Sequence, residues 1–119
     1  VVEAERRTKD TAEIELIDDN GESLVVDAGK VRDALMGGFA GSKILEVHGK
    51  RMLDNDFRPG FKTKLHQKDL KIVIDSAHAL GVGLPATALV AQQMNALMGA
   101  GDGELDSAAL VKVLERMTR

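Results

Sequence analysis

One stretch decides the fold of this chain: residues 62–98, which read KTKLHQKDLKIVIDSAHALGVGLPATALVAQQMNALM. Its first half is typical of a long helix from about Lys62 to Leu80, because the apolar residues recur at helical spacing. Gly81 suits the end of that helix, and Pro85 suits the first position of the next one, where its missing N–H costs nothing. We therefore expect two consecutive long helices joined by a short turn.

Each of these two helices carries an apolar stripe that we expect to face the core. The expected core residues are Leu65, Ile72, Val73 and Leu80 on the first helix, and Leu89, Val90, Met94, Leu97 and Met98 on the second. Met94, Met98 and Met117 fall on helical stripes and are most simply core residues.

Shorter helices are predicted on both sides of this pair, each beginning at a polar capping residue. The caps are Asp27, for a helix that ends near Gly37, then Ser42, and finally Asp106 or Ser107. The apolar residues of the last two helices are Ile44, Leu45, His48 and Met52, and Leu110, Val113, Leu114 and Met117. The chain is therefore predicted to be mainly α, a helical bundle.

Residues 1–26 differ from the rest of the chain. Ile14 and Leu16 alternate with acidic residues, which is the period of a half-buried strand. The run Asp18-Asp19-Asn20-Gly21 is a strong hairpin-turn signal, and a short apolar run follows it. We expect a small β-hairpin here and a division of the chain near Asp27.

The composition excludes several classes of protein. A length of 119 residues suits a single domain, and a net charge of −3 spread along the chain argues against nucleic acid as the main partner. The chain has no cysteine, which excludes disulfides, thiolate chemistry and Cys-based zinc sites and suits a reducing compartment. No apolar run approaches the roughly 20 residues of a membrane helix, and no signal peptide is visible. We expect a cytoplasmic protein.

Four motifs in a fixed order carry a family resemblance. They are GGFAGS at 37–42, NDFRPGF at 55–61, LHQKDL at 65–70 and GAGDGELDSA at 99–108. Together they resemble the C-terminal domain of the β-hydroxyacid dehydrogenase family, closest to its tartronate semialdehyde reductase branch and also similar to the 3-hydroxyisobutyrate dehydrogenases. The resemblance runs from about Val31 to Met117.

The resemblance implies a function. Enzymes of this family are oxidoreductases that bind NADP or NAD in an N-terminal Rossmann domain and transfer hydride to or from an alcohol or aldehyde beside a carboxylate. Their helical C-terminal domain closes the active site and contributes to dimers. On this reading residues 27–119 form a substrate-closing and dimerisation domain, residues 1–26 are an atypical segment, and a homo-oligomer is expected.

The sequence departs from the family pattern in its first part. No G-x-G-x-x-G follows a strand, so the Rossmann fingerprint is absent from these residues. The family's catalytic lysine is followed four residues later by an asparagine, but here Lys9 is followed by Glu13. We therefore assign no catalytic residue and expect the chain alone to be inactive and to bind no cofactor tightly. A fragment, a fusion and a designed domain are all compatible with this pattern, and the alternative function is a non-catalytic self-association or partner-binding module.

Two residues are candidates for cofactor binding by resemblance. Lys68 would reach the cofactor or substrate, since an ammonium is a point charge for a phosphate or carboxylate. The competing interpretation is a solvated lysine paired with Asp69. Phe61 would wall the cofactor cleft, but an aromatic residue just outside a helix more often packs inward as a core anchor.

Gly41 and Ser42 are the candidates for substrate binding, again by resemblance. The simpler interpretation, which we favour, is a tight turn followed by a helix N-cap. A phosphate-binding loop is excluded, because that motif needs a lysine directly after its second glycine. No metal site is predicted, since His48, His66 and His78 lack the spacing of any metal motif.

Overall fold

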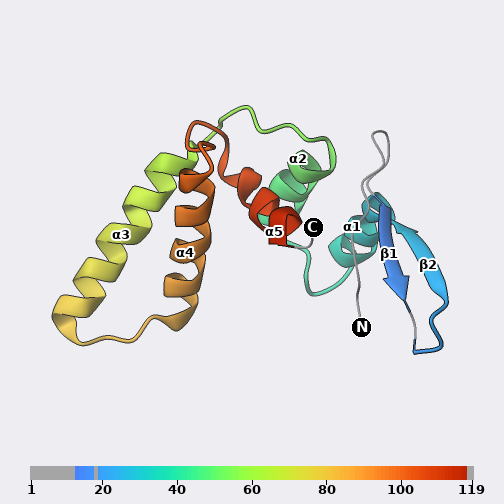
Figure 1. The fold of residues 1–119 in the computed structure, drawn as a ribbon, viewed down its shortest axis with the longest axis horizontal. Coiled ribbons are helices and arrows are strands. Elements are labelled where there is room, and N and C mark those ends of the chain that lie inside the picture. Colours follow the sequence, from blue (N-terminus) through green and yellow to red (C-terminus); the bar gives the residue numbers. More distant parts are fainter. Residues whose placement is uncertain (1–12, 18, 118–119) are drawn as a thin grey trace. The chain divides into compact units, whose positions relative to one another are not determined.

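The computed structural model describes residues 13–17 and 19–117, and these are mainly helical (Figure 1). In chain order the elements are β1 (Glu13–Ile17), β2 (Ser23–Asp27), α1 (Ala28–Met36), the π-helical segment η1 (Leu45–Gly49), α2 (Lys50–Leu53), α3 (Thr63–Leu80), α4 (Pro85–Gly99), the 3-10 helix η2 (Ser107–Leu110) and α5 (Val111–Met117). The predicted fold class, mainly α with an N-terminal hairpin, is confirmed. Lys9, which entered the prediction about catalysis, lies outside the described residues.

The chain divides into two compact units. The first ends at Asp56 and also includes the chain from Glu115, and the second spans Phe57–Leu114. The predicted functional division near Asp27 is a separate matter and stays a prediction. None of the described helices is both long enough and apolar enough to cross a bilayer.

The first unit begins with the predicted hairpin. β1 and β2 pair antiparallel, with Ile14 opposite Val26 and Leu16 opposite Leu24. Asp27 then ends β2 and caps α1, because its Oδ1 atom accepts the N–H of Lys30 at 2.8 Å. Asp27 is thus both the last residue of β2 and the N-cap of α1. Its capping role was predicted from the sequence.

The short helices of the first unit are joined by the side chain of Arg32 on α1. Its Nε donates to the carbonyl of Leu45 at 3.3 Å and its Nη2 to that of Glu46 at 2.9 Å. The predicted apolar face of the second helix is only partly right. Leu45 is half-buried, but Ile44 is exposed, so it is not a core residue in this chain.

The second unit is built on the two long helices, which run antiparallel beside each other (Figure 1). α3 ends at Leu80 and is followed by its C-cap Gly81, which has a φ of +68°. Glycine adopts this left-handed conformation at little cost because it has no Cβ. Pro85 is the first residue of α4. Both helices and the turn between them were predicted from sequence, and all three are confirmed.

The core of the second unit is small and mostly aliphatic. Its buried apolar residues are Phe57, Ala77, Ala91, Met94, Leu97, Ala108, Ala109 and Val113. Met94 and Leu97 were predicted correctly from the stripe of α4. The alanines let α3, α4 and η2 approach closely.

The predicted core stripe of α3 is wrong. Leu65, Ile72, Val73 and Leu80 are all exposed, Ile72 by 56% and Leu80 by 78%. The buried or half-buried residues of α3 instead include Thr63, Leu70, Ile74 and Ala77. Helical periodicity finds an apolar face but does not say which neighbour covers it. Leu89, Met98, Leu114 and Met117 were also expected in the core and are exposed.

Candidate functional site

The candidate site begins with a buried carboxylate. The side chain of Asp106 is 1% exposed, and its Oδ2 atom accepts the backbone N–H of Gly60 at 2.8 Å and of Phe61 at 3.1 Å. Its Oδ1 atom accepts the N–H of Ala108 at 3.0 Å, which caps η2. The cap was predicted from the sequence, but the bonds to the Pro59-Gly60-Phe61 loop were not. A charged acceptor makes each of these bonds stronger than a neutral one.

The start of α3 is joined to the same segment through the backbone. The N–H of Thr63 donates to the carbonyl of Leu105 at 2.8 Å, and that of Lys64 donates to Gly103 at 3.0 Å. The Thr63 hydroxyl, fully buried, lies 3.1 Å from the same Leu105 carbonyl. These bonds satisfy first-turn N–H groups that have no partner within the helix. Residues 103–106 therefore replace a side-chain cap for α3.

A surface ion cluster fastens the same junction from outside. Glu104 pairs with Lys62, whose Nζ lies 2.8 Å from Oε2, and with Lys64 through Oε1. Hydrogen bonds from Lys62 and Lys64 lower the pKa of Glu104 from its ordinary 4.5 to about 2. The carboxylate is thus ionised at neutral pH, and two lysines at the start of α3 are already paired.

Phe61 lies where these contacts converge, and its main chain is fixed on both sides. Besides its N–H bond to Asp106, its carbonyl accepts the N–H of Ser107 at 3.0 Å and the hydroxyl of the same residue at 3.2 Å. Its ring is 45% exposed and lies 5.9 Å from the ring of His66, tilted by 60°. Phe61 is therefore not the core anchor that we favoured.

The anchor of this loop is Phe57, which is buried, with Nζ of Lys112 5.0 Å from its ring centroid. The sequence shows two phenylalanines in one motif and does not say which one packs inward. The choice follows from the Asp106 hydrogen bonds, which hold the Gly60-Phe61 peptide at the surface of the unit.

Lys68 lies on α3 with an exposed side chain. Its Nζ is 2.9 Å from Oδ1 of Asp69, the pairing that the competing interpretation expected. An exposed ion pair of this kind contributes little and is easily exchanged for another anion. Lys71 on the same helix is likewise exposed and paired, with Asp75 at 2.6 Å. The cofactor role of Lys68 stays a prediction.

Gly41 and Ser42 lie in the first unit, whereas Phe61 and Lys68 lie in the second. A Cβ at Gly41 would stand 2.7 Å from the carbonyl oxygen of Met36, so no side chain fits there. The Ser42 hydroxyl accepts the N–H of Leu45 at 3.0 Å and caps the following helix. The turn and N-cap are therefore present as the simpler interpretation predicted, and the substrate role of both residues stays a prediction.

Two hollows lie along the α3–α4 pair. One of about 200 Å³ is lined by Lys71, Ile74, Ala91 and Gln92, and by Gln67 and Asn95, which are bonded across it at 2.8 Å from Nε2 to Oδ1. This polar contact was not predicted from the sequence, although an uncharged amide on each of two consecutive helices was a signal for it.

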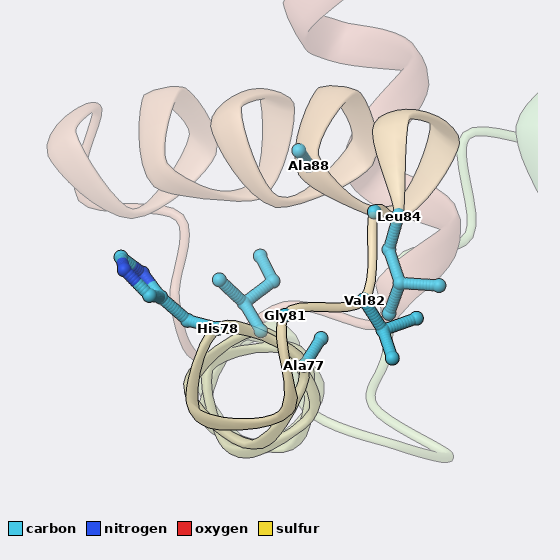
Figure 2. Close-up of a pocket in the computed structure, with 8 residues that line it drawn as sticks. Ala77, His78, Gly81, Val82, Leu84 and Ala88 are labelled. Carbon is cyan, nitrogen blue, oxygen red and sulfur yellow. The ribbon is translucent and has the colours of Figure 1, made fainter.

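The larger hollow, of about 380 Å³, lies at the turn between the helices (Figure 2). Figure 2 shows Ala77 and His78 on α3 and Ala88 on α4 bounding it, with Val82 and Leu84 from the turn. Its lining is mostly apolar and includes the side chain of His78. In the part of the chain that the structure describes, no three His, Asp or Glu side chains gather as a metal site would require.

Known proteins that are similar to this chain indicate its family. Residues 20–114 match the family model described as the NAD-binding domain of NADP-dependent 3-hydroxyisobutyrate dehydrogenase. The 2-hydroxy-3-oxopropionate reductase of Escherichia coli (strain K12) is 53% identical over 91 residues, which are 76% of this chain and 31% of that protein. A probable 3-hydroxyisobutyrate dehydrogenase-like 1 protein, mitochondrial, of Arabidopsis thaliana is 38% identical over 92 residues, 77% of this chain and 28% of the relative.

The fold also matches a solved structure. The crystal structure of 3-hydroxyisobutyrate dehydrogenase from Salmonella typhimurium superposes with a TM-score of 0.69 at 26% identity, covering 72% of this chain and 30% of that one. The chain therefore spans about a third of the length of the relatives it matches.

Proposed function

The chain belongs to the 3-hydroxyisobutyrate dehydrogenase family, and from that premise we propose that it is the helical, active-site-closing part of an NAD(P)-dependent β-hydroxyacid dehydrogenase. The substrate we propose is 2-hydroxy-3-oxopropionate, because the E. coli reductase of that name is 53% identical to this chain over 91 residues. In this proposal residues 27–119 close over the substrate and form the dimer contact, and residues 1–26 are a separate segment. We also propose that the protein is cytoplasmic, because a chain without cysteine suits a reducing compartment.

One observation carries the proposal: Phe61 presents an exposed ring on a clamped main chain. Three hydrogen bonds hold its N–H and carbonyl, and in one of them the N–H donates to the buried carboxylate of Asp106. Binding sites need side chains held in place by surrounding contacts, because an ordered surface loses less entropy when a ligand arrives.

The residues present fit one side of a nicotinamide cofactor. The Phe61 ring offers a flat apolar surface, and Lys68 offers a cation that is released by breaking one exposed ion pair. When bound, the cofactor supplies the hydride for the carbonyl carbon. The chain's own residues would bind and orient: Phe61 walls the cleft, Lys68 meets a phosphate or carboxylate, and Gly41 and Ser42 lie on the substrate side.

A chimeric enzyme tests this function. Residues 27–119 replace the matching part of the E. coli reductase, and NADPH oxidation is followed with 2-hydroxy-3-oxopropionate as substrate. We expect turnover by the chimera and none by the isolated chain. Lys68→Ala should lower kcat/KM by at least about tenfold, equivalent to about 1.4 kcal/mol. Lys71→Ala is the matched control, because it removes another exposed, ion-paired lysine of α3.

Three results would count against the proposal. An inactive but folded chimera would contradict the assignment of this chain as the closing part of such an enzyme. Equal losses in Lys68→Ala and Lys71→Ala would reduce Lys68 to an ordinary surface lysine. Turnover by the isolated 119-residue chain would contradict the need for a separate cofactor domain.

Self-association is a second candidate function, and the exposed side of α3 favours it. Four apolar side chains on one side of the helix are between 41% and 78% exposed: Leu65, Ile72, Val73 and Leu80. In α4 and its flanking turns, residues 81–101 contain no charged side chain. Large exposed apolar patches are typical of surfaces that bind another protein. We therefore propose a homodimer that covers this side of α3.

A further inference from the structure

The hydroxyl of Ser107 lies between two groups that could accept its proton. Its Oγ atom is 3.1 Å from Nδ1 of His66 and 3.2 Å from the carbonyl oxygen of Phe61. The first distance is usual for a hydrogen bond between nitrogen and oxygen, and the second is long for a bond between two oxygens. Ser107 belongs to η2 and His66 to α3, so this contact joins residues 41 positions apart in the sequence.

The number of protons decides how both contacts can be hydrogen bonds at once. A serine hydroxyl carries one proton and can accept through its lone pairs. If Nδ1 of His66 is unprotonated, the hydroxyl must choose between the ring and the carbonyl, and one contact is lost. If Nδ1 carries the proton, it donates to Oγ, and the hydroxyl donates to Phe61. Only the second arrangement satisfies both distances.

We infer that Ser107 and His66 are positioning residues for Phe61, linked in one direction as His66 Nδ1–H to Ser107 Oγ–H to the Phe61 carbonyl. The inference rests on the proposed function only in taking Phe61 as part of a binding surface. The neutral His66 ring is then held in the Nδ1–H form, with Nε2 unprotonated. The ring makes no other hydrogen bond within residues 13–17 and 19–117.

The two hydrogen bonds from His66 to Ser107 and from Ser107 to Phe61, here called the relay, hold a part of Phe61 that Asp106 does not hold. Asp106 holds the N–H side of Phe61, whereas Ser107 holds the carbonyl side through both its N–H and its hydroxyl. His66 in turn orients the hydroxyl and lies 5.9 Å from the Phe61 ring. Ser107 therefore contacts the peptide of Phe61, and His66 contacts both Ser107 and the Phe61 ring.

Nitrogen NMR of the full 119-residue chain tests the inference. The chain is labelled with ¹⁵N-histidine, and the pH is raised until the ring signals stop changing. His66 should show a protonated-type shift at Nδ1 and an unprotonated-type shift at Nε2. His78 is the reference, because it lies on the same helix and its side chain makes no hydrogen bond within the described part of the chain. It should show the opposite pattern, which is the usual one for a free imidazole.

Two variants separate positioning from a general loss of structure. Ser107→Ala should return His66 to the pattern of His78 and speed hydrogen exchange of the Phe61 amide by about fivefold, the effect of losing one hydrogen bond. Ser107→Thr keeps the hydroxyl and should restore both signals. A wild-type His66 that already matches His78, or one that keeps Nδ1–H in Ser107→Ala, would overturn the inference.

No cofactor enters this measurement, so its outcome is independent of the proposed enzyme activity. A wild-type His66 in the Nδ1–H form together with an inactive chimera would leave the relay standing and remove only the proposed function.

Discussion

The Oδ2 atom of Asp106 lies 2.8 Å from the backbone nitrogen of Gly60, a residue 46 positions earlier in the chain. The same atom accepts the N–H of Phe61. One buried carboxylate therefore joins the loop before α3 to the segment that begins η2. The position of Phe61, the candidate residue for cofactor binding, depends on this link, because the two hydrogen bonds fix the peptide that carries its ring.

Removing the charge of Asp106 should destabilise the second unit. In Asp106→Asn one oxygen that accepts a backbone N–H becomes an NH₂ donor in a buried position, so at least one bond to Gly60, Phe61 or Ala108 is lost. We expect the free energy of unfolding to fall by about 3 kcal/mol, the range for an unsatisfied group in a charged network. Urea unfolding measures it.

Asp75→Asn is the matched control for that experiment. Asp75 is exposed and pairs with Lys71 on the surface of α3, so its loss should change stability by no more than about 0.5 kcal/mol. Similar midpoints for the two variants would mean that the Asp106 bonds contribute nothing beyond a surface ion pair.

Glu104 should make stability depend on pH in acid. Its pKa is lowered to about 2 in the folded chain, against an ordinary 4.5, by the hydrogen bonds from Lys62 and Lys64. Because the pKa of the carboxyl group is lower in the folded chain than in the unfolded chain, ionised Glu104 stabilises the folded state at pH values above 4.5. This contribution is lost as the pH falls from 4.5 toward about 2. The stability difference between wild type and Glu104→Gln should therefore shrink over that window.

Because Glu104 is exposed, the same difference should shrink with added salt at neutral pH. Direct titration of the carboxyl by NMR provides the check. A midpoint near 4.5 would show that the two lysines do not hold the carboxylate in solution.

Gly81 should resist substitution for a reason of backbone conformation alone. A Cβ there would meet no atom within 4 Å, but the φ of +68° is unfavourable for any other residue. We expect Gly81→Ala to lower the free energy of unfolding by about 1 kcal/mol. In Gly83→Ala the added methyl also meets open space at an ordinary φ, so this control should be neutral or slightly stabilising. Equal effects of both changes in thermal unfolding would remove the conformational explanation.

The exposed side of α3 should drive association of the isolated chain. Ile72→Lys places a charge in the middle of the apolar residues Leu65, Val73 and Leu80, so we expect it to shift the chain to monomer. Sedimentation equilibrium over a range of concentrations measures this. Asp75→Asn changes the net charge by the same amount at an exposed position of α3 and should leave the association unchanged. A wild-type chain that stays monomeric at every concentration would contradict the proposed dimer.

Local sequence patterns determined most of the fold. The helical spacing of residues 62–98, the left-handed preference of Gly81 and the place of Pro85 at a helix start all act within a few residues, so α3, α4 and their turn could be predicted. The capping side chains of Asp27 and Asp106 and the hairpin turn are equally local. The order of the four motifs also sufficed to indicate the family.

The tertiary structure decided which apolar face of a helix is covered and which polar groups form hydrogen bonds. α3 has two faces able to pack, and the one with Thr63 and Ala77 is buried whereas the one with Ile72 is exposed. The meetings of Asp106 with Gly60 and of Ser107 with His66 join residues more than 40 positions apart. Periodicity along one helix carries no information about such contacts, because they depend on how the chain returns and on which donors would otherwise be buried without an acceptor.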